Sequence, residues 1–161
     1  GCEVPIKVTP HNYKPNLLLQ GFLDVVLYHE PTQTFKIIDI KTSRSGWNKK
    51  IKSDENKQFQ LILYKKYFSE LYNVPLEKIE VEFFIVKRKL YESKDFIIRR
   101  IQTYTPPSGK VKMNRVQKSL NDFINGAFNS DGFKEVDHKP TPHRNCNWCP
   151  FYKTHLCSAT F

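Results

Sequence analysis

The chain has 161 residues, a length that fits one domain with a sizeable apolar core. No apolar run approaches the ~18 residues of a membrane span, and no signal peptide is visible, so we expect an intracellular protein (cytoplasmic, nucleoid or nuclear) that is not secreted. The net charge of +10 favours a polyanionic partner. Because no basic amphipathic helix has a clean apolar face, nucleic acid is favoured over a membrane.

The first half of the chain predicts two strands and a basic loop. Residues 1–16 contain three prolines and little periodicity, which indicates an extended lead-in. Residues 17–28 and 34–41 are rich in β-branched and aromatic residues and predict strands, joined by a turn at 29–33. The short connection favours an antiparallel hairpin. Residues 42–53 are polar and basic and predict a loop.

The next segment predicts a helix. Ser53 or Asp54 can cap its beginning, and Asn73-Val74-Pro75 ends it. One stripe of this helix is expected to face the core: Phe59, Ile62, Leu63, Tyr67 and Leu71.

The remaining elements complete an α/β pattern. Residues 79–87 predict a central strand, residues 95–104 an edge strand, and the segment to about residue 129 a helix. The order β-β-α-β-β-α predicts one α/β domain with a mixed central sheet flanked by helices. It would consist of the lead-in 1–16, a catalytic core 17–129 and an irregular, cysteine-bearing, metal-binding tail 130–161.

Two acids lie inside the apolar strand segments, Asp24 in the first and Asp39 in the second. Burying a carboxylate without a partner is costly or shifts its pKa, so each acid needs a cation. Lys41 lies two residues after Asp39 and projects from the same face of a strand. If the strands form a hairpin, the two carboxylates and the ammonium converge on a site for a hard divalent cation and a phosphate.

Three motifs resemble those of the PD-(D/E)xK nuclease superfamily, in particular its RecB-like and Cas4-like branch. They are Gly21-x-x-Asp24, Asp39-Ile40-Lys41 and Gln60-x-x-x-Tyr64. The resemblance implies a restriction-endonuclease-like core in which Asp24, Asp39 and the carbonyl of Ile40 bind Mg²⁺ or Mn²⁺. Lys41 would orient the water or neutralise charge on the phosphate. The resemblance places Gln60 and Tyr64 beside the DNA backbone and the active site, where both are expected to act in catalysis.

The loop at residues 42–53 leaves directly from Lys41 and therefore borders the predicted site. Its cations and its aromatic residue suit a mobile flap over a nucleic-acid groove: Arg44, Trp47, Lys49, Lys50 and Lys52. In this interpretation Trp47 stacks on a base. The alternative is a solvated loop whose Trp47 is tucked against the core.

Three of the four cysteines fall within twelve residues: Cys146, Cys149 and Cys157. A C-x-x-C pair in a chain without export signals is more typical of metal binding than of a disulfide. The motif resembles the C-terminal cysteines of iron–sulfur nucleases of the Cas4-like and AddB type, which implies a [4Fe–4S] cluster with Cys2 as fourth ligand. The alternatives are Zn²⁺, with His143 or His155 as fourth ligand, and buried thiols without metal.

These observations predict a metal-dependent deoxyribonuclease that hydrolyses DNA phosphodiester bonds, exonuclease-like on DNA ends or single strands. Two alternatives stay open. One is a catalytically silent nucleic-acid-binding domain of the same fold. The other is a structural metal-binding module whose acids form only ion pairs.

Overall fold

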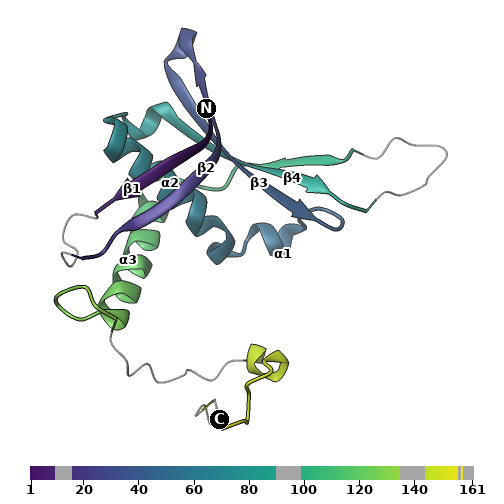
Figure 1. The fold of residues 1–161 in the computed structure, drawn as a ribbon. Coiled ribbons are helices and arrows are strands. Elements are labelled where there is room, and N and C mark those ends of the chain that lie inside the picture. The colour runs from purple at the N-terminus through teal and green to yellow at the C-terminus, as the bar shows by residue number, and fades with distance from the viewer. Residues whose placement is uncertain (10–15, 90–98, 135–143, 156, 158–161) are drawn as a thin grey trace.

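A computed structural model describes residues 1–9, 16–89, 99–134, 144–155 and 157. Five strands form one sheet in the order β1-β2-β3-β4-β5 (Figure 1). They are β1 (Cys2–Val8), β2 (Leu19–His29), β3 (Thr34–Ser43), β4 (Ile79–Lys87) and β5 (Ile101–Tyr104). Strands β3 and β4 are parallel, and the other neighbours are antiparallel. This mixed sheet with flanking helices confirms the predicted fold class.

The helices lie on one side of the sheet (Figure 1). They are α1 (Lys49–Lys52), α2 (Glu55–Tyr72) and α3 (Lys110–Ala127), with short 3-10 turns η1 (Glu30–Thr32), η2 (Leu76–Lys78) and η3 (Arg144–Trp148). Helix α2 connects β3 to β4 and contacts β1, β3 and β4, whereas α3 packs against α2. None of the helices in the described ranges is long and apolar enough to cross a membrane.

Helix α2 has the expected ends but a different buried face. The Asp54 side chain accepts the N–H of Asn56 at 3.1 Å, and Asn73 ends the helix in the left-handed conformation. Phe68 is buried, whereas Leu71, expected in the core, is 44% exposed. Because α2 contacts the sheet and α3 at once, its buried arc is not the single stripe that the spacing indicated.

The predicted lead-in is in part a strand. β1 pairs antiparallel with β2, from Cys2 opposite Val25 to Val8 opposite Leu19, and its Ile6 is fully buried. Pro5 argued against a strand in the sequence, because proline has no N–H to donate to a neighbouring strand. An edge strand tolerates this loss, and β1 lies at the edge of the sheet.

Two other predicted segments have different bounds. The loop at residues 42–53 contains α1, which Asn48 caps by accepting the N–H of Ile51 at 2.9 Å. The last strand begins at Ile101, and residues 95–98 of the predicted strand lie outside the described residues. The predicted strand at residues 79–87 has the bounds of β4 and lies between β3 and β5.

The core fills the space between the sheet and α2. It joins inward-facing residues of four strands to the helix, among them Ile6, Leu23, Ile37, Leu61, Val81, Phe83 and Ile85. A smaller cluster of Ile62, Met113 and Val116 attaches α3 to α2. This packing holds α2 against the strands that carry the predicted catalytic residues.

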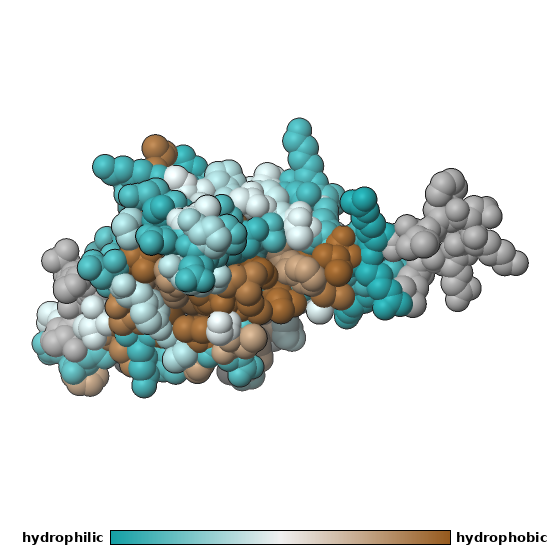
Figure 2. Space-filling model, turned by 90° about the horizontal axis from the view of Figure 1, so that it is seen from above, coloured by the Kyte–Doolittle hydropathy of each residue, from teal (hydrophilic) through white to brown (hydrophobic). Residues whose placement is uncertain are grey.

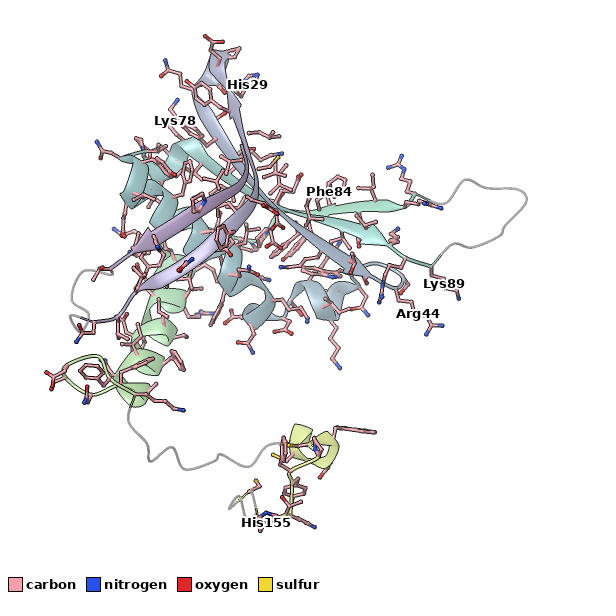
Figure 3. The ribbon with its side chains drawn as sticks, viewed as in Figure 1. His29, Arg44, Lys78, Phe84, Lys89 and His155 are labelled. Carbon is pink, nitrogen blue, oxygen red and sulfur yellow. The ribbon has the colours of Figure 1, made fainter. Side chains whose placement is uncertain are left out.

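The opposite face of the sheet carries apolar side chains. A band of them crosses the molecule when it is seen from above (Figure 2). Phe22, Leu27, Ile40 and Ile101 lie on this face and are between 45% and 53% exposed. Phe22 and Leu27 share it although they are five residues apart, because the ladders of β2 skip Asp24. Phe84 lies on the same side of β4, away from α1 (Figure 3). In the ranges that the structure describes, no helix packs on this face.

Candidate active site

Asp24 lies on β2, next to the residue at which the pairing with β3 begins. β2 pairs with β1 from Leu19 to Val25, with Asp24 skipped, and with β3 from Val25 to His29. Asp24 itself has no partner residue in either ladder of the described sheet. Its Oδ2 instead accepts the backbone N–H of Ile40 at 2.6 Å. This bond holds the carboxylate beside β3.

Asp39 is buried on β3 next to Lys41. The Lys41 Nζ donates to Asp39 Oδ1 at 3.1 Å and lies 2.8 Å from Oδ2. Oδ2 is close to the ammonium but accepts no aligned hydrogen bond from the described residues. Burial raises the pKa of Asp39, the Lys41 ammonium opposes this rise, and the charge of Asp24 adds to it. The site therefore holds two nearby carboxylates, one with an unsatisfied oxygen.

These groups fit a hard divalent cation. A buried carboxylate oxygen that accepts no aligned hydrogen bond is a group that a divalent cation could bind, and the two like charges would share the cation. The N–H of Ile40 points to Asp24, and the N–H and C=O of one strand residue project to the same side. Asp24, Asp39 and the Ile40 carbonyl would thus hold the ion through oxygen, which suits Mg²⁺ or Mn²⁺. The described residues gather no group of three histidine, cysteine or acidic side chains, so the Ile40 carbonyl and water would complete the coordination.

Helix α2 supplies two polar side chains to the site. The Lys41 Nζ donates to Gln60 Oε1 at 3.0 Å, and Gln60 Nε2 donates to Tyr64 Oη at 3.0 Å. Gln60 and Tyr64 are four residues apart and project from one side of the helix. The structure thus brings together Asp24, Asp39, Lys41, Gln60 and Tyr64. Gln58 lies elsewhere, buried and hydrogen-bonded to Tyr104 Oη at 3.2 Å.

Gly21 lies against the ring of Tyr64. A Cβ at this position would be 2.8 Å from Tyr64 Cε1 and 3.0 Å from Tyr64 Oη. The absence of a side chain therefore lets Tyr64 lie against β2, within reach of Gln60. Sequence reasoning did not include Gly21 among the site residues, although its place in the Gly21-x-x-Asp24 motif was the signal that could have done so.

Gly21→Ala should displace Tyr64 and loosen the hydrogen bond that Gln60 donates to Tyr64 and, through Gln60, the one that it accepts from Lys41. We expect cleavage to fall about tenfold, which corresponds to about 1.4 kcal/mol on the activation barrier. Gly126→Ala is the matched control, because a Cβ there meets nothing within 4 Å. In a Tyr64→Ala background, Gly21→Ala should add little. An equal loss in both backgrounds would show that Gly21 supports β2 and does not act through Tyr64.

The residues of the predicted flap have different surroundings. Trp47 is half-buried, with its ring centre 4.9 Å from that of Phe83 and 6.4 Å from that of Tyr104. This placement matches the alternative in which Trp47 is tucked against the core, and it does not support stacking on a base. Arg44, Lys49 and Lys50 are exposed. The Nζ of Lys52 lies 5.4 Å from the ring centre of Tyr104.

The four cysteines are not gathered into one ligand set. Cys2 lies on β1, whereas the C-terminal segment with the other three lies apart from it (Figure 1). Within that segment the N–H of Cys149 donates to the carbonyl of Cys146 at 2.9 Å, which forms a tight turn. As placed, the cysteines do not fit a [4Fe–4S] cluster, because no three potential ligands of the described chain converge. His143, a predicted zinc ligand, lies outside the described residues, and His155 joins no such group.

The fold and the site define a class of protein. The mixed sheet places two acids and a lysine on the neighbouring strands β2 and β3, beside a polar face of α2. This arrangement is suited to metal-dependent phosphodiester hydrolysis. A family model of the PD-(D/E)XK nuclease superfamily matches residues 1–154, and the chain belongs to this superfamily. Its members are typically metal-dependent nucleases, which implies binding of nucleic acid.

Comparison with individual proteins adds little. No curated protein matches the chain. The chain is similar to the solved structure described as "Crystal structure of SSO0001", with 17% sequence identity and a TM-score of 0.48. The match covers 94% of this chain and 57% of the other, so the chain spans little more than half the length of that protein.

Proposed function

We propose that the chain is a metal-dependent deoxyribonuclease of the RecB-like and Cas4-like branch, with exonuclease-like action on DNA ends or single strands. The observation that carries the proposal is the buried Asp39 Oδ2, which has no aligned hydrogen bond although Lys41 is adjacent. The Lys41 ammonium lies 2.8 Å from this oxygen, but the oxygen accepts no aligned hydrogen bond from the described residues, which leaves lone pairs for a further ligand. An acceptor left open beside a second carboxylate favours a cation site.

Each site residue has a role that its contacts support. When bound, a divalent cation would supply an activated water and charge stabilisation on the phosphate. Lys41, held by Asp39 and Gln60, presents positive charge to the phosphate or the attacking water. Tyr64 Oη accepts from Gln60, so its own hydrogen is left to donate to a phosphate oxygen.

The proposed substrate follows from charge as well as from the site. The net charge of +10 favours a polyanion, and DNA provides a phosphate at every nucleotide. The catalytically silent binding domain stays the alternative function. The presence of Asp24, Asp39 and Lys41 at one site favours catalysis over that alternative: Asp39 pairs with Lys41, and Asp24 is held at Ile40, near enough for its charge to act on Asp39.

A nuclease assay tests the proposal directly. End-labelled linear DNA and closed circular DNA are incubated with Mg²⁺, with Mn²⁺ or with a chelator. We expect degradation of linear or single-stranded DNA with either metal, intact circles, and no product with chelator. Cleavage of closed circles would replace exonuclease-like with endonuclease action. DNA binding without cleavage under any of these conditions would favour the silent domain.

The [4Fe–4S] cluster on Cys2, Cys146, Cys149 and Cys157 stays a prediction based on the sequence resemblance. The C-x-x-C spacing supports it, and the positions of the cysteines do not. No step of the proposed hydrolysis depends on the cluster.

A further inference from the structure

Cations gather beyond Lys41, at the end of the sheet where β3 and β4 end and β5 begins. The N–H of Arg88 donates to the carbonyl of Ser43, and the N–H of Lys87 to that of Arg100, both at 2.8 Å. These bonds place three distant segments side by side. We call their six basic residues the basic strand end: Arg44, Lys87, Arg88, Lys89, Arg99 and Arg100. Figure 3 shows Arg44 and Lys89 next to each other at this end of the sheet.

The basic strand end sets like charges against each other. The register of β4 and β5 pairs Val86 with Ile101, and one step further places Lys87 opposite Arg100, in agreement with their hydrogen bond. Like charges directly opposite on an antiparallel pair are destabilising. Neither side chain forms an ion pair within the described part of the chain. An anion bound there would compensate this repulsion.

The other end of the same strands differs in charge. There Lys36 lies 3.8 Å from Glu80 and 3.6 Å from Glu82, and the Lys78 Nζ donates to the carbonyl of Thr32. Cations at that end thus have partners, and acids are interspersed with them. Within the described ranges, Lys87 and Arg100 have no acidic side chain in such a position at the end of the sheet that follows Lys41.

The basic strand end is aligned with the candidate active site. Lys87 pairs with Ser43, which lies four residues after Asp39 on β3. At about 3.3 Å per strand residue, the separation along the strand is about 13 Å. Alternation places Asp39, Lys41 and Ser43 on one face, and Lys87 projects from that face through its pairing. A nucleic-acid strand covers this distance in about four nucleotides, at about 3.4 Å each.

We propose that the basic strand end is a second nucleic-acid contact, which binds backbone phosphates about four nucleotides from the phosphate at Asp39 and Lys41. This second contact rests on the proposed function only in that one nucleic acid would occupy both the basic strand end and the candidate active site. The contact positions the strand and carries no base specificity, because cations contact phosphates whatever the sequence.

The test is the salt dependence of DNA binding. The double variant Lys87→Gln and Arg100→Gln is made in an Asp39→Asn background, with chelator, so that the DNA stays intact. For duplex DNA, the slope of log K against log salt should fall in magnitude by about 1.8, or about 0.9 for each lost phosphate contact. The matched control is Lys66→Gln with Lys118→Gln, since those lysines already pair with Glu70 and Asp122. Its slope should stay near that of the parent.

The outcomes separate this proposal from the nuclease function. An unchanged slope, or an equal change in the control, overturns the second contact even if the wild type cuts DNA. A reduced slope supports it even if the wild type cuts nothing, in which case only the nuclease function fails. Polyglutamate that binds more tightly than DNA, and no longer binds the variant, would point to an acidic protein partner and overturn the proposal.

Thermal stability gives a second readout. Without DNA and at low salt, Lys87→Gln or Arg100→Gln alone should raise the melting temperature, because each removes the repulsion between the two cations. Added salt should shrink the gain, since it screens exposed charges. A lower melting temperature for both variants would assign the pair a structural role and overturn the proposal.

Discussion

Asp39→Asn is expected to abolish metal-dependent cleavage and leave the chain folded. The amide keeps the volume of the carboxyl group but removes the negative charge that a divalent cation needs from its ligand. We expect the rate to fall on the order of a thousandfold or more, as when a group that organises transition-state charge is removed. The measurement is single-turnover cleavage of end-labelled DNA with Mg²⁺ or Mn²⁺. Asp122→Asn, an exposed acid of α3, is the control and should cleave normally.

The pH dependence of folding provides a readout without catalysis. Burial raises the pKa of Asp39 in the folded chain above the ordinary value of an aspartate side chain. A carboxyl group with a raised native pKa adds stability below its unfolded pKa and loses it as pH rises through the native pKa. In chelator, Asp39→Asn should therefore unfold at a higher temperature than wild type near neutral pH, and the gain should vanish in acid. A variant that is less stable near neutral pH would indicate a structural ion pair with Lys41.

Binding of a divalent cation should stabilise the proteins that retain Asp39, and so offset the gain in melting temperature that Asp39→Asn shows in chelator. At 100 times its dissociation constant, a ligand that binds only the folded state adds about 2.7 kcal/mol. Mg²⁺ or Mn²⁺ should thus raise the melting temperature of the wild type and of Asp122→Asn, but not that of Asp39→Asn. An equal shift in all three proteins would place the cation elsewhere.

Lys41→Met should reduce turnover far more than metal affinity. Methionine keeps part of the aliphatic stem but removes the ammonium that Asp39 and Gln60 hold. We expect a loss on the order of a hundredfold to a thousandfold in single-turnover cleavage, the range found when one electrostatic donor to the reacting group is lost. The melting-temperature shift caused by Mg²⁺ should persist, because Lys41 is not a proposed ligand.

The control for this variant is Lys65→Met. Lys65 is a partly buried lysine of α2 whose pKa burial lowers, and its Nζ lies 3.4 Å from Ser108 Oγ, outside the site. It should cleave at the wild-type rate. If Lys41→Met lost metal affinity and turnover in equal measure, Lys41 would hold the two carboxylates in place and would not act on the phosphate.

Sequence reasoning succeeded where the signal is local. The apolar run at residues 79–87 gave the bounds of β4, and the short turn after β2 gave the hairpin. The spacings from Asp39 to Lys41 and from Gln60 to Tyr64 each fix a shared face of one element. These residues therefore meet as the pattern indicated once β3 and α2 pack together.

The missed features depend on partners far away in the sequence. β1 becomes a strand only because β2 offers it a ladder, which Pro5 concealed. Two hydrogen bonds with the Gln102 side chain hold the backbone of Trp47. Gln102 accepts the N–H of Trp47 at 2.7 Å and donates to its carbonyl at 3.1 Å. The basic strand end joins residues near 43, 87 and 100, which no spacing rule connects.

The position of Asp24, outside both ladders of β2, predicts which residues relatives of this chain retain. Asp24 has a backbone role besides the proposed catalytic one. Its Oδ2 accepts the Ile40 N–H, while Asp24 itself has no partner residue in either ladder of β2. A lineage that lost nuclease activity would still be selected for a hydrogen-bond acceptor there. Selection would then favour replacing Asp39, where it had favoured keeping it. Once no cation is bound, a buried carboxylate with an oxygen that accepts no aligned hydrogen bond only lowers stability. Inactive descendants should therefore retain Asp or Asn at position 24 and turn apolar at position 39, which makes the second position the marker of a working nuclease.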